Sequence, residues 1–298
     1  MGKPSVLGID IGGSHITAAL VNLETRSIVR NSYKRKFVNS QDSAERIVTS
    51  WCEIIEESFN STDVLSKKIG IAMPGPFDYE NGISLMCDQD KFNDLYKLNI
   101  KEELAKRLNI PVKDIRFIND AVGFLQGEVF GGAARKYSKV LGLTLGTGLG
   151  SAIHREGITE DADLWDSKFK EGIAEDYLSG RWFSMRYNEL TGETIKGVKE
   201  LIQLQGSESY KERIFLEYAH NLASFIVPLI HKYDLEAVVI GGNISNAFEL
   251  FLPELSRILK ENGTETAIEI AHLKEDASLM GAASCWEDSY KRTTLNKF

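Results

Sequence analysis

The segment Asp10-Ile11-Gly12-Gly13-Ser14 places one carboxylate, two glycines and a hydroxyl directly after an apolar run. Glycines let a backbone approach a bulky anion and adopt the positive φ angles of a tight turn, and successive N–H groups there form an anion-binding concavity. In this interpretation, Ser14 and the glycine N–H groups bind phosphate oxygens, while Asp10 holds a hydrated Mg²⁺. The alternative is a structural hairpin whose aspartate bonds its own turn.

The pair Asn119-Asp120 is the second candidate for chemistry. It ends a predicted strand over 112–118 and precedes a helical pattern from Ala121, and ligands of open α/β sheets gather at such strand ends. Asp120 would take the proton from an attacking hydroxyl, and Asn119 would orient the acceptor. The alternative is a helix N-cap, for which Asn and Asp are favoured.

Two further glycine turns follow later in the chain. In Gly146-Thr147-Gly148-Leu149-Gly150 the next residue is Ser and no amphipathic helix follows, so the segment is not a dinucleotide motif but predicts a second phosphate-contacting turn. Gly241-Gly242 ends an apolar strand and is either a tight turn or a nucleotide contact. Glu175 is a further candidate, although the first turn of a helix also favours a glutamate.

These residues need strands to position them, and the strands predict a duplication. Val6 to Gly12 resembles Val140 to Gly146, 134 residues later: four positions are identical and two exchange Ile for Leu. Each copy leads into a glycine turn and a second apolar strand, which predicts two related halves that each begin with an antiparallel hairpin. Asp10 is replaced by Thr144 in the second copy, so the carboxylate belongs to the first half alone.

The rest of the chain alternates predicted strands and helices. Asp42 is expected to cap a first helix, and Glu175 to Leu190 is expected to be one continuous helix. The acidic stretch from Glu156 to Glu171 has no clear period and is expected to be a loop.

Length, composition and charge limit the class of protein. A chain of 298 residues exceeds a usual single core, so two domains of about 100 to 200 residues are expected. The net charge of −8 argues against nucleic acid as a partner. Three distant cysteines encode neither a disulfide framework nor a CxxC-type zinc site. Because no apolar run approaches the length of a membrane span and no secretory segment is evident, we expect a cytoplasmic protein with no membrane partner.

Six motifs in order carry a resemblance that covers nearly the whole chain. Together they resemble the ROK family of sugar kinases and sugar-responsive repressors. They are Asp10 to Ser14, Pro74-Gly75-Pro76, Asn119-Asp120-Ala121, Leu145 to Gly150, Ile240 to Asn243 and Leu279 to Ala283.

The resemblance implies an α/β fold of actin/hexokinase type, ribonuclease H-like and duplicated, with an active-site cleft between two domains. We expect a smaller N-terminal domain over 1–118 and a larger one over 119–298, with a C-terminal helix at about 284–298 packing back on the first. A homodimer is also implied.

The expected ligand contacts combine the motifs with this resemblance. The residues expected to meet the donor ATP are Asp10, Gly12, Gly13, Ser14, Thr147, Gly148, Gly241 and Gly242. The residues expected to meet the sugar are Gly75, Pro76, Asn119, Asp120, Asp163 and Glu175.

The chain also departs from the family pattern. It has no cysteine between residues 88 and 284, so the family's zinc site is expected to be missing, as in the similar polyphosphate glucokinase branch. On that alignment Asp163 replaces the glutamate of the family's Glu-x-Gly-His motif and Asp166 replaces its histidine, while Glu171 competes with Asp163 for the first sugar-contacting carboxylate. The identity of the sugar therefore stays open.

The resulting prediction is an ATP- and Mg²⁺-dependent, glucokinase-like kinase. It would phosphorylate glucose or a related hexose at a primary hydroxyl, expected to be the 6-OH, with Asp120 as general base. Polyphosphate is the alternative donor. The alternative functions are a sugar-responsive regulator, which the start of the phosphate turn within the first ten residues disfavours, and a non-catalytic sugar-binding protein.

Overall fold

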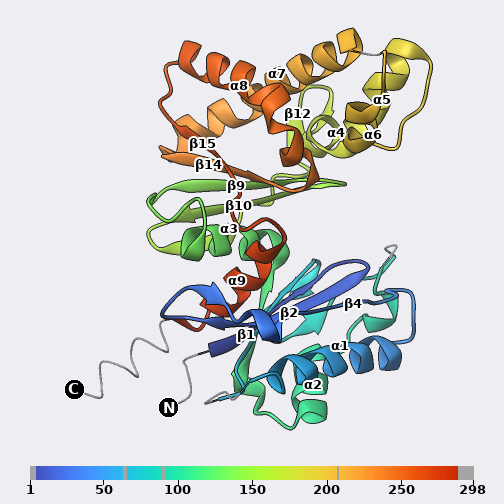
Figure 1. The fold of residues 1–298 in the computed structure, drawn as a ribbon, viewed down its shortest axis with the longest axis vertical. Helices are drawn as coiled ribbons and strands as arrows, with labels where there is room; N and C mark the ends of the chain where they lie inside the picture. The colour runs from blue at the N-terminus through green and yellow to red at the C-terminus, as the bar shows by residue number, and fades with distance from the viewer. Residues whose placement is uncertain (1–4, 63–65, 89–90, 207, 288–298) are drawn as a thin grey trace. The chain divides into compact units, whose positions relative to one another are not determined.

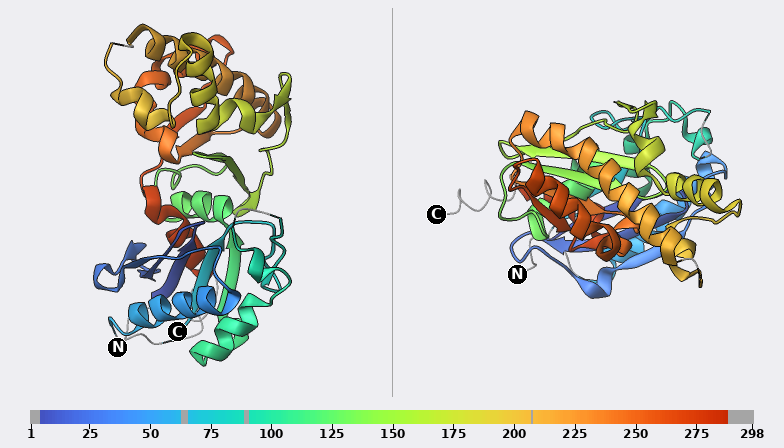
Figure 2. Two further views of the ribbon diagram at one scale, coloured as in Figure 1. Left: turned by 90° about the vertical axis from the view of Figure 1, so that its right-hand side faces the viewer. Right: turned by 90° about the horizontal axis from the view of Figure 1, so that it is seen from above.

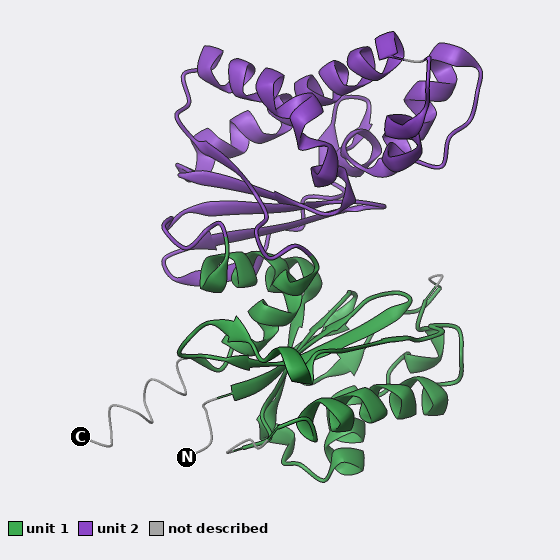
Figure 3. Ribbon diagram, in the orientation of Figure 1, with its two compact units in different colours: residues 1–132, 275–298 green, residues 133–274 purple. Residues whose placement is uncertain are grey.

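The computed structural model describes residues 5–62, 66–88, 91–206 and 208–287. The chain divides into two compact units: unit 1 comprises residues 1–132 and 275–298, and unit 2 comprises residues 133–274 (Figure 3). The division at residue 118 stays a prediction; in the structure, α3 (Asp120–Gly131) groups with unit 1. Most of the expected helix over 284–298 lies outside the described residues.

Unit 1 is built on a six-stranded sheet of order β3-β2-β1-β5-β8, with β4 also paired to β2. The β1–β2 pair is antiparallel, whereas β1, β5 and β8 run parallel. Helices α1 and α2 lie on one face of the sheet, and α3 and α9 lie on the other (Figure 1). The main elements are β1 (Ser5–Ile11), β2 (His15–Asn22), β3 (Ser27–Ile28), β4 (Lys34–Phe37), α1 (Ala44–Phe59), β5 (Ile69–Met73), β6 (Phe77–Asp78), β7 (Ile83–Ser84), α2 (Ile100–Leu108), β8 (Ile115–Asn119) and α9 (Ala277–Ser284).

Helix α9 packs directly on the sheet because two strand glycines leave room for its backbone. A Cβ on Gly8 would lie 2.2 Å from the carbonyl oxygen of Leu279, and one on Gly70 would lie 1.9 Å from that of Ala282. Any larger residue at either position would push the helix away from β1 and β5. This contact brings the segment after unit 2 back into the core of unit 1.

Unit 2 repeats the arrangement of unit 1. Its five-stranded sheet has the order β11-β10-β9-β14-β15, in which β9 and β10 form an antiparallel hairpin and β9, β14 and β15 run parallel. The duplication predicted from the sequence is confirmed. The elements are β9 (Val140–Leu145), β10 (Leu149–Arg155), β11 (Ile158–Asp161), β12 (Lys168–Phe169), β13 (Gly172–Ile173), α4 (Ala174–Leu178), α5 (Gly180–Thr191), α6 (Val198–Gln203), α7 (Glu208–Tyr233), β14 (Ala237–Gly241), α8 (Phe248–Glu261) and β15 (Ala267–Ile270).

The core of unit 2 lies between its sheet and its helices. Helices α7 and α8 lie side by side over the sheet, as the right-hand view of Figure 2 shows. The aromatic rings of Phe183 and Tyr218 pack with centroids 4.6 Å apart, and Phe251 packs edge-on against Tyr218. These buried rings fix α5, α7 and α8 to one another.

Three local expectations were wrong. Residues 156–171 are not all loop, because β11 pairs with β10 and β12 pairs with β13. The expected helix over 175–190 is broken at Ser179, where α4 ends and α5 begins. The first helix begins after Ser43, whose side chain forms no capping bond, rather than after Asp42. Among the described residues, no helix combines the length and apolar character needed to cross a membrane.

Candidate active site

Asp10 lies one residue before the end of β1, in the middle of the unit 1 sheet. The strand around it is apolar and buried, while its own side chain is half-buried. Burial, followed by the negative charge of Asp120, raises the pKa of the Asp10 carboxyl from 3.8 to about 7, and the positive charge of Arg35 opposes this shift. A cation bound beside Asp10 would favour the ionised carboxylate.

The turn after β1 is open. The Gly12 N–H donates to the carbonyl of His15 at 2.9 Å and closes the β1–β2 hairpin, and Ser14 Oγ lies 2.9 Å from the Nδ1 atom of His15. Neither Gly12 nor Gly13 has a φ angle in the left-handed region, so the expectation that these glycines serve a positive φ was wrong.

Packing does not explain these two glycines either. A Cβ on Gly12 would lie 3.7 Å from its nearest neighbour, the His15 carbonyl oxygen, and one on Gly13 would lie 3.5 Å from Lys91 Cδ. Both are ordinary van der Waals distances. Gly8 and Gly70 have no such room. The glycines of the turn therefore leave a space that the protein itself does not fill.

Asn119 and Asp120 lie at the end of β8 and the start of α3. Asn119 Oδ1 accepts hydrogen bonds from the N–H groups of Ala121 at 2.8 Å and Val122 at 3.2 Å, so Asn119 is the N-cap of α3. The Asn119 amide also donates to the hydroxyl of Tyr79 at 3.2 Å. The capping alternative is therefore present at Asn119, together with a polar contact beyond the helix.

The Asp120 side chain is accessible to solvent, although its carboxylate accepts a hydrogen bond from the N–H of Ala121 at 2.9 Å. Desolvation by the surrounding protein raises the pKa of the Asp120 carboxyl above its usual value, and the positive charge of Lys91 opposes the shift. A raised pKa brings a carboxylate closer to the range in which a general base works best.

Sheet topology brings Asp10 and Asp120 to one edge. Asp10 pairs with Ala72 on β5, and Met73 on β5 pairs with Asn119 on β8, so three parallel strands end together. Two strand spacings amount to about 10 Å. Ligands of α/β sheets bind outside such carboxyl ends.

The ligands that the protein supplies suit a magnesium ion that is shared with substrate phosphates. Among the described residues, no three His, Cys, Asp or Glu side chains gather into a metal-binding group. Mg²⁺ usually keeps several waters and uses one or two carboxylates plus substrate phosphates, rather than a cage made only of protein. A lone carboxylate beside an open glycine turn suits that mode.

The loop after β5 connects to the same edge. The Tyr79 hydroxyl donates to the Met73 carbonyl at 3.1 Å and accepts from Asn119. Gly75 is half-buried and Pro76 is exposed, and the peptide bond between them is cis. Tyr79 thus joins this loop to the start of α3.

In unit 2, the turn after β9 is supported by a carboxylate. Glu175 accepts a hydrogen bond from the Leu149 N–H at 3.0 Å and pairs with Arg181, and the Gly180 N–H donates to the Gly146 carbonyl at 2.7 Å. A Cβ on Gly148 would lie 2.7 Å from a Glu175 carboxylate oxygen. Glu175 therefore supports the glycine turn.

The other glycines of unit 2 differ in what they require. A Cβ on Gly146 would meet nothing within 4 Å, and Thr147 beside it is exposed. Gly242, in contrast, has a φ of +81°, and a Cβ there would lie 2.4 Å from the Leu145 carbonyl oxygen. Gly241 pairs with Thr144 in the sheet. The fold itself therefore requires glycine at position 242, whereas the space around Gly146 would accept a larger residue.

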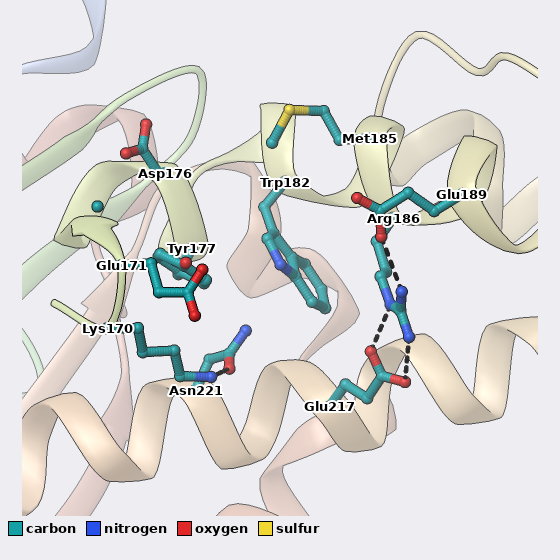
Figure 4. Close-up of a pocket in the computed structure, with 11 residues that line it drawn as sticks. Lys170, Glu171, Asp176, Tyr177, Trp182, Met185, Arg186, Glu189, Glu217 and Asn221 are labelled. Carbon is teal, nitrogen blue, oxygen red and sulfur yellow. Dashed lines mark hydrogen bonds and ion pairs between the residues drawn. The ribbon is translucent and has the colours of Figure 1, made fainter.

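The two alternative sugar-contacting carboxylates lie in different surroundings. Asp163 accepts a hydrogen bond from the Trp165 indole N–H at 3.0 Å, and the Trp165 carbonyl accepts one from the Glu175 N–H at 3.0 Å. Glu171 instead lines a polar pocket of about 480 Å³ with Asp176, Arg186 and others (Figure 4). Asp163 is thus linked through Trp165 to Glu175, whereas Glu171 faces a separate cavity. Asp166 is exposed.

Sequence reasoning missed two cations of unit 1 that act on these carboxylates, Arg35 and Lys91. Arg35 is on β4 and forms an ion pair with Glu275. Lys91 lies in an irregular segment after β7. Neither belongs to a recognisable motif, so no signal in the sequence marks them.

Comparison with known proteins gives consistent matches. Residues 6–160 and 170–289 match the model of the ROK family. The glucokinase of Thermotoga maritima is 27% identical, with 95% of this chain and 98% of that protein covered. The N-acetyl-D-glucosamine kinase of Pectobacterium carotovorum is 25% identical, with 82% and 85% covered.

A solved structure resembles the fold of the chain. A ROK family glucokinase from Streptomyces griseus, in complex with glucose and AMPPNP, superposes with a TM-score of 0.72 at 22% identity, covering 94% of this chain and 98% of that one. The expected α/β fold of actin/hexokinase type is confirmed.

Proposed function

This chain belongs to the ROK family and is a sugar kinase, and we propose that it transfers the γ-phosphoryl group of ATP to a primary hydroxyl of a hexose. The observation that carries this proposal is the pair of carboxylates, Asp10 and Asp120, at one sheet edge beside an open glycine turn. The turn suits phosphate oxygens, and a carboxylate of raised pKa suits a hydroxyl proton.

In the proposed reaction, Asp120 accepts the proton of the attacking hydroxyl, expected to be the 6-OH. The hydroxyl oxygen forms a bond to the γ-phosphorus as the bond between that phosphorus and the bridging oxygen of ADP breaks. Mg²⁺, when bound with the donor, offsets charge on the phosphates, and Asp10 would hold it through water. The backbone of Gly12 and Gly13 and the hydroxyl of Ser14 would hold phosphate oxygens.

In unit 1, the sugar would be held by polar groups next to Asp120. The Asn119 amide, fixed by its bonds to α3 and Tyr79, would orient it, and the loop at Gly75 and Pro76 would limit its size. From unit 2, Asp163 and Glu175 are proposed for the remaining hydroxyls. Thr147, Gly148, Gly241 and Gly242 are proposed contacts of the nucleotide.

A finer question is which hexose the kinase prefers. The relatives named above include a glucokinase and an N-acetyl-D-glucosamine kinase. Sites that hydrogen-bond particular hydroxyls reject analogues lacking them, because their own polar groups are then left unpaired. One hexose or one N-acetyl hexosamine should therefore be strongly preferred.

A coupled assay of ADP release tests the proposal. Glucose, mannose, glucosamine, N-acetylglucosamine and N-acetylmannosamine are each supplied with Mg²⁺ and ATP, and sugar phosphate is measured with polyphosphate as donor. We expect phosphorylation of one of these sugars and its loss on chelation of the metal. Folded protein that phosphorylates none of them with either donor would contradict the proposal.

A further inference from the structure

Lys91 lies beside two parts of the proposed site that come from distant points in the sequence. Its Cδ atom would be 3.5 Å from a Cβ on Gly13, so its aliphatic stem lies alongside the open turn. Its positive charge is the largest charged influence on the Asp120 carboxyl. Gly13, Lys91 and Asp120 all belong to unit 1. The stem of Lys91 therefore lies beside the turn proposed for the donor, and its positive charge acts on the proposed base.

The residue after Lys91 fixes its position. Phe92 is fully buried, its ring packs on Trp51 with centroids 5.7 Å apart, and its N–H donates to the Ser40 carbonyl at 2.8 Å. Phe92 also has a φ of +59°. The left-handed region costs a bulky residue about 1–2 kcal/mol, and such strain gathers at functional sites. The bend sends Phe92 into the core and leaves Lys91 beside the turn.

The ammonium group of Lys91 is not engaged in a hydrogen bond or an ion pair with the described part of the protein. Across the ranges of chain that the structure describes, Lys91 forms no hydrogen bond and no ion pair within 4.0 Å. Arg35, the other cation acting on these carboxylates, is already paired with Glu275. Lys91 is thus the cation left available to an incoming anion near Asp120.

We propose that Lys91 is a catalytic residue of the kinase, whose ammonium group contacts the phosphoryl group during its transfer to the sugar hydroxyl. This rests on the function proposed above. In phosphoryl transfer, negative charge spreads over three equatorial oxygens, and a fixed cation there stabilises the transition state more than the ground state. Lys91 moves no proton: the hydroxyl proton passes to Asp120, and Lys91 keeps its charge throughout.

The test compares Lys91→Met and Lys91→Arg with the wild type. We expect Lys91→Met to lower kcat by about a hundredfold or more, while the dissociation constant of the sugar, measured by calorimetry, changes less than threefold. Lys91→Arg keeps the charge and should recover much of the loss. Lys106→Met removes an exposed lysine of α2 and serves as the matched control, with kcat unchanged.

Each outcome decides between the two proposals. If wild-type protein phosphorylates a sugar and Lys91→Met keeps kcat within threefold, the role of Lys91 is refuted and the kinase function stands. A rise in the sugar KM at unchanged kcat would also refute it, because the residue would then act in binding. If the wild type phosphorylates no sugar, both fail. Should Lys91→Met not fold, Lys91→Gln is judged by the same criteria.

Discussion

Asp120 combines solvent access with partial desolvation, and that combination suits a base. Replacing it with Asn removes the proton acceptor and keeps the shape of the side chain. We expect Asp120→Asn to lower kcat about a hundredfold or more, while sugar binding stays near normal by calorimetry. Near-normal turnover in this variant would refute the role assigned to Asp120.

Asp10 predicts how stability depends on pH in protein free of divalent metal. Its pKa is raised from 3.8 to about 7 on folding, so between these values the folded state keeps a proton that the unfolded chain has lost. The contribution of this proton to the free energy of unfolding is fully present below about pH 4 and is lost as the pH rises through 7.

The measurement compares Asp10→Asn with the wild type. Asn does not titrate. As the pH rises from 4.5 to 8, the free energy of unfolding of the wild type should therefore fall by about 2–4 kcal/mol relative to that of the variant. Urea unfolding at several pH values, with a metal chelator present, gives the difference. A difference independent of pH would show that folding does not perturb Asp10.

At the scale of single residues, the sequence predicted the residues of local motifs but not the residues that the fold brings next to them. Asp10 and Asp120 could be selected because a carboxylate beside glycines and an Asx pair at a strand end are local patterns. Lys91 could not, because its place depends on where the buried ring of Phe92 turns the chain. No local pattern of residue types encodes that bend.

At the scale of elements, two glycines of the β1–β2 hairpin allow ligand binding and packing to be tested separately. A Cβ on Gly12, in the turn after β1, fits at ordinary contact distances, whereas a Cβ on Gly8, within β1, meets the α9 backbone at 2.2 Å. Gly12→Ala should therefore leave the Tm within about 2 °C but raise the KM for ATP about tenfold or more, because the methyl group occupies the space proposed for phosphate.

Gly8→Ala is the matched control for that experiment. It should lower the Tm by about 5 °C or more, since overpacking costs about 1–3 kcal/mol. Thermal melting and steady-state kinetics of both variants are the measurements. An unchanged KM for ATP in Gly12→Ala would mean that the open turn does not meet the donor.

The elements predicted well are those with a strong local pattern. The β1–β2 and β9–β10 hairpins follow from apolar runs joined by glycine turns, and the runs of the first hairpin are rich in β-branched residues. Strand β11 was missed because its residues Ile158–Asp161 are mostly exposed and lack apolar alternation; pairing with β10 alone makes it a strand. The break between α4 and α5 accompanies the Gly180–Gly146 hydrogen bond, a contact between distant segments.

At the scale of the whole molecule, unit 2 is an insertion between two parts of unit 1. The motif order and the internal repeat predicted two duplicated halves. The return of residues 275–287 to unit 1 depends on small residues that allow close packing, and a repeat alone does not reveal such a contact.

Trp286 shows how firmly the returning segment is attached. Its ring is buried, its indole N–H donates to the Ile69 carbonyl at 3.1 Å, and the Arg116 guanidinium lies 3.9 Å from the ring centroid. Trp286→Ala should lower the free energy of unfolding by about 3–5 kcal/mol. Trp286→Phe keeps an aromatic ring and should lose less. Urea unfolding checks both, and a loss below about 1 kcal/mol in the alanine variant would contradict this attachment.

The insertion also sets an order of events while the chain is being made. All strands of the unit 1 sheet have left the ribosome once residue 119 has emerged, yet the helix that covers β1 and β5 begins only at Ala277. At about 5–20 residues per second, roughly 8–30 seconds separate the two. Throughout that interval β1 and β5 lack the α9 backbone that packs on them, although α3 of the same face has already been made. Unit 1, although its strands are made first, is therefore the last part of the fold to be completed.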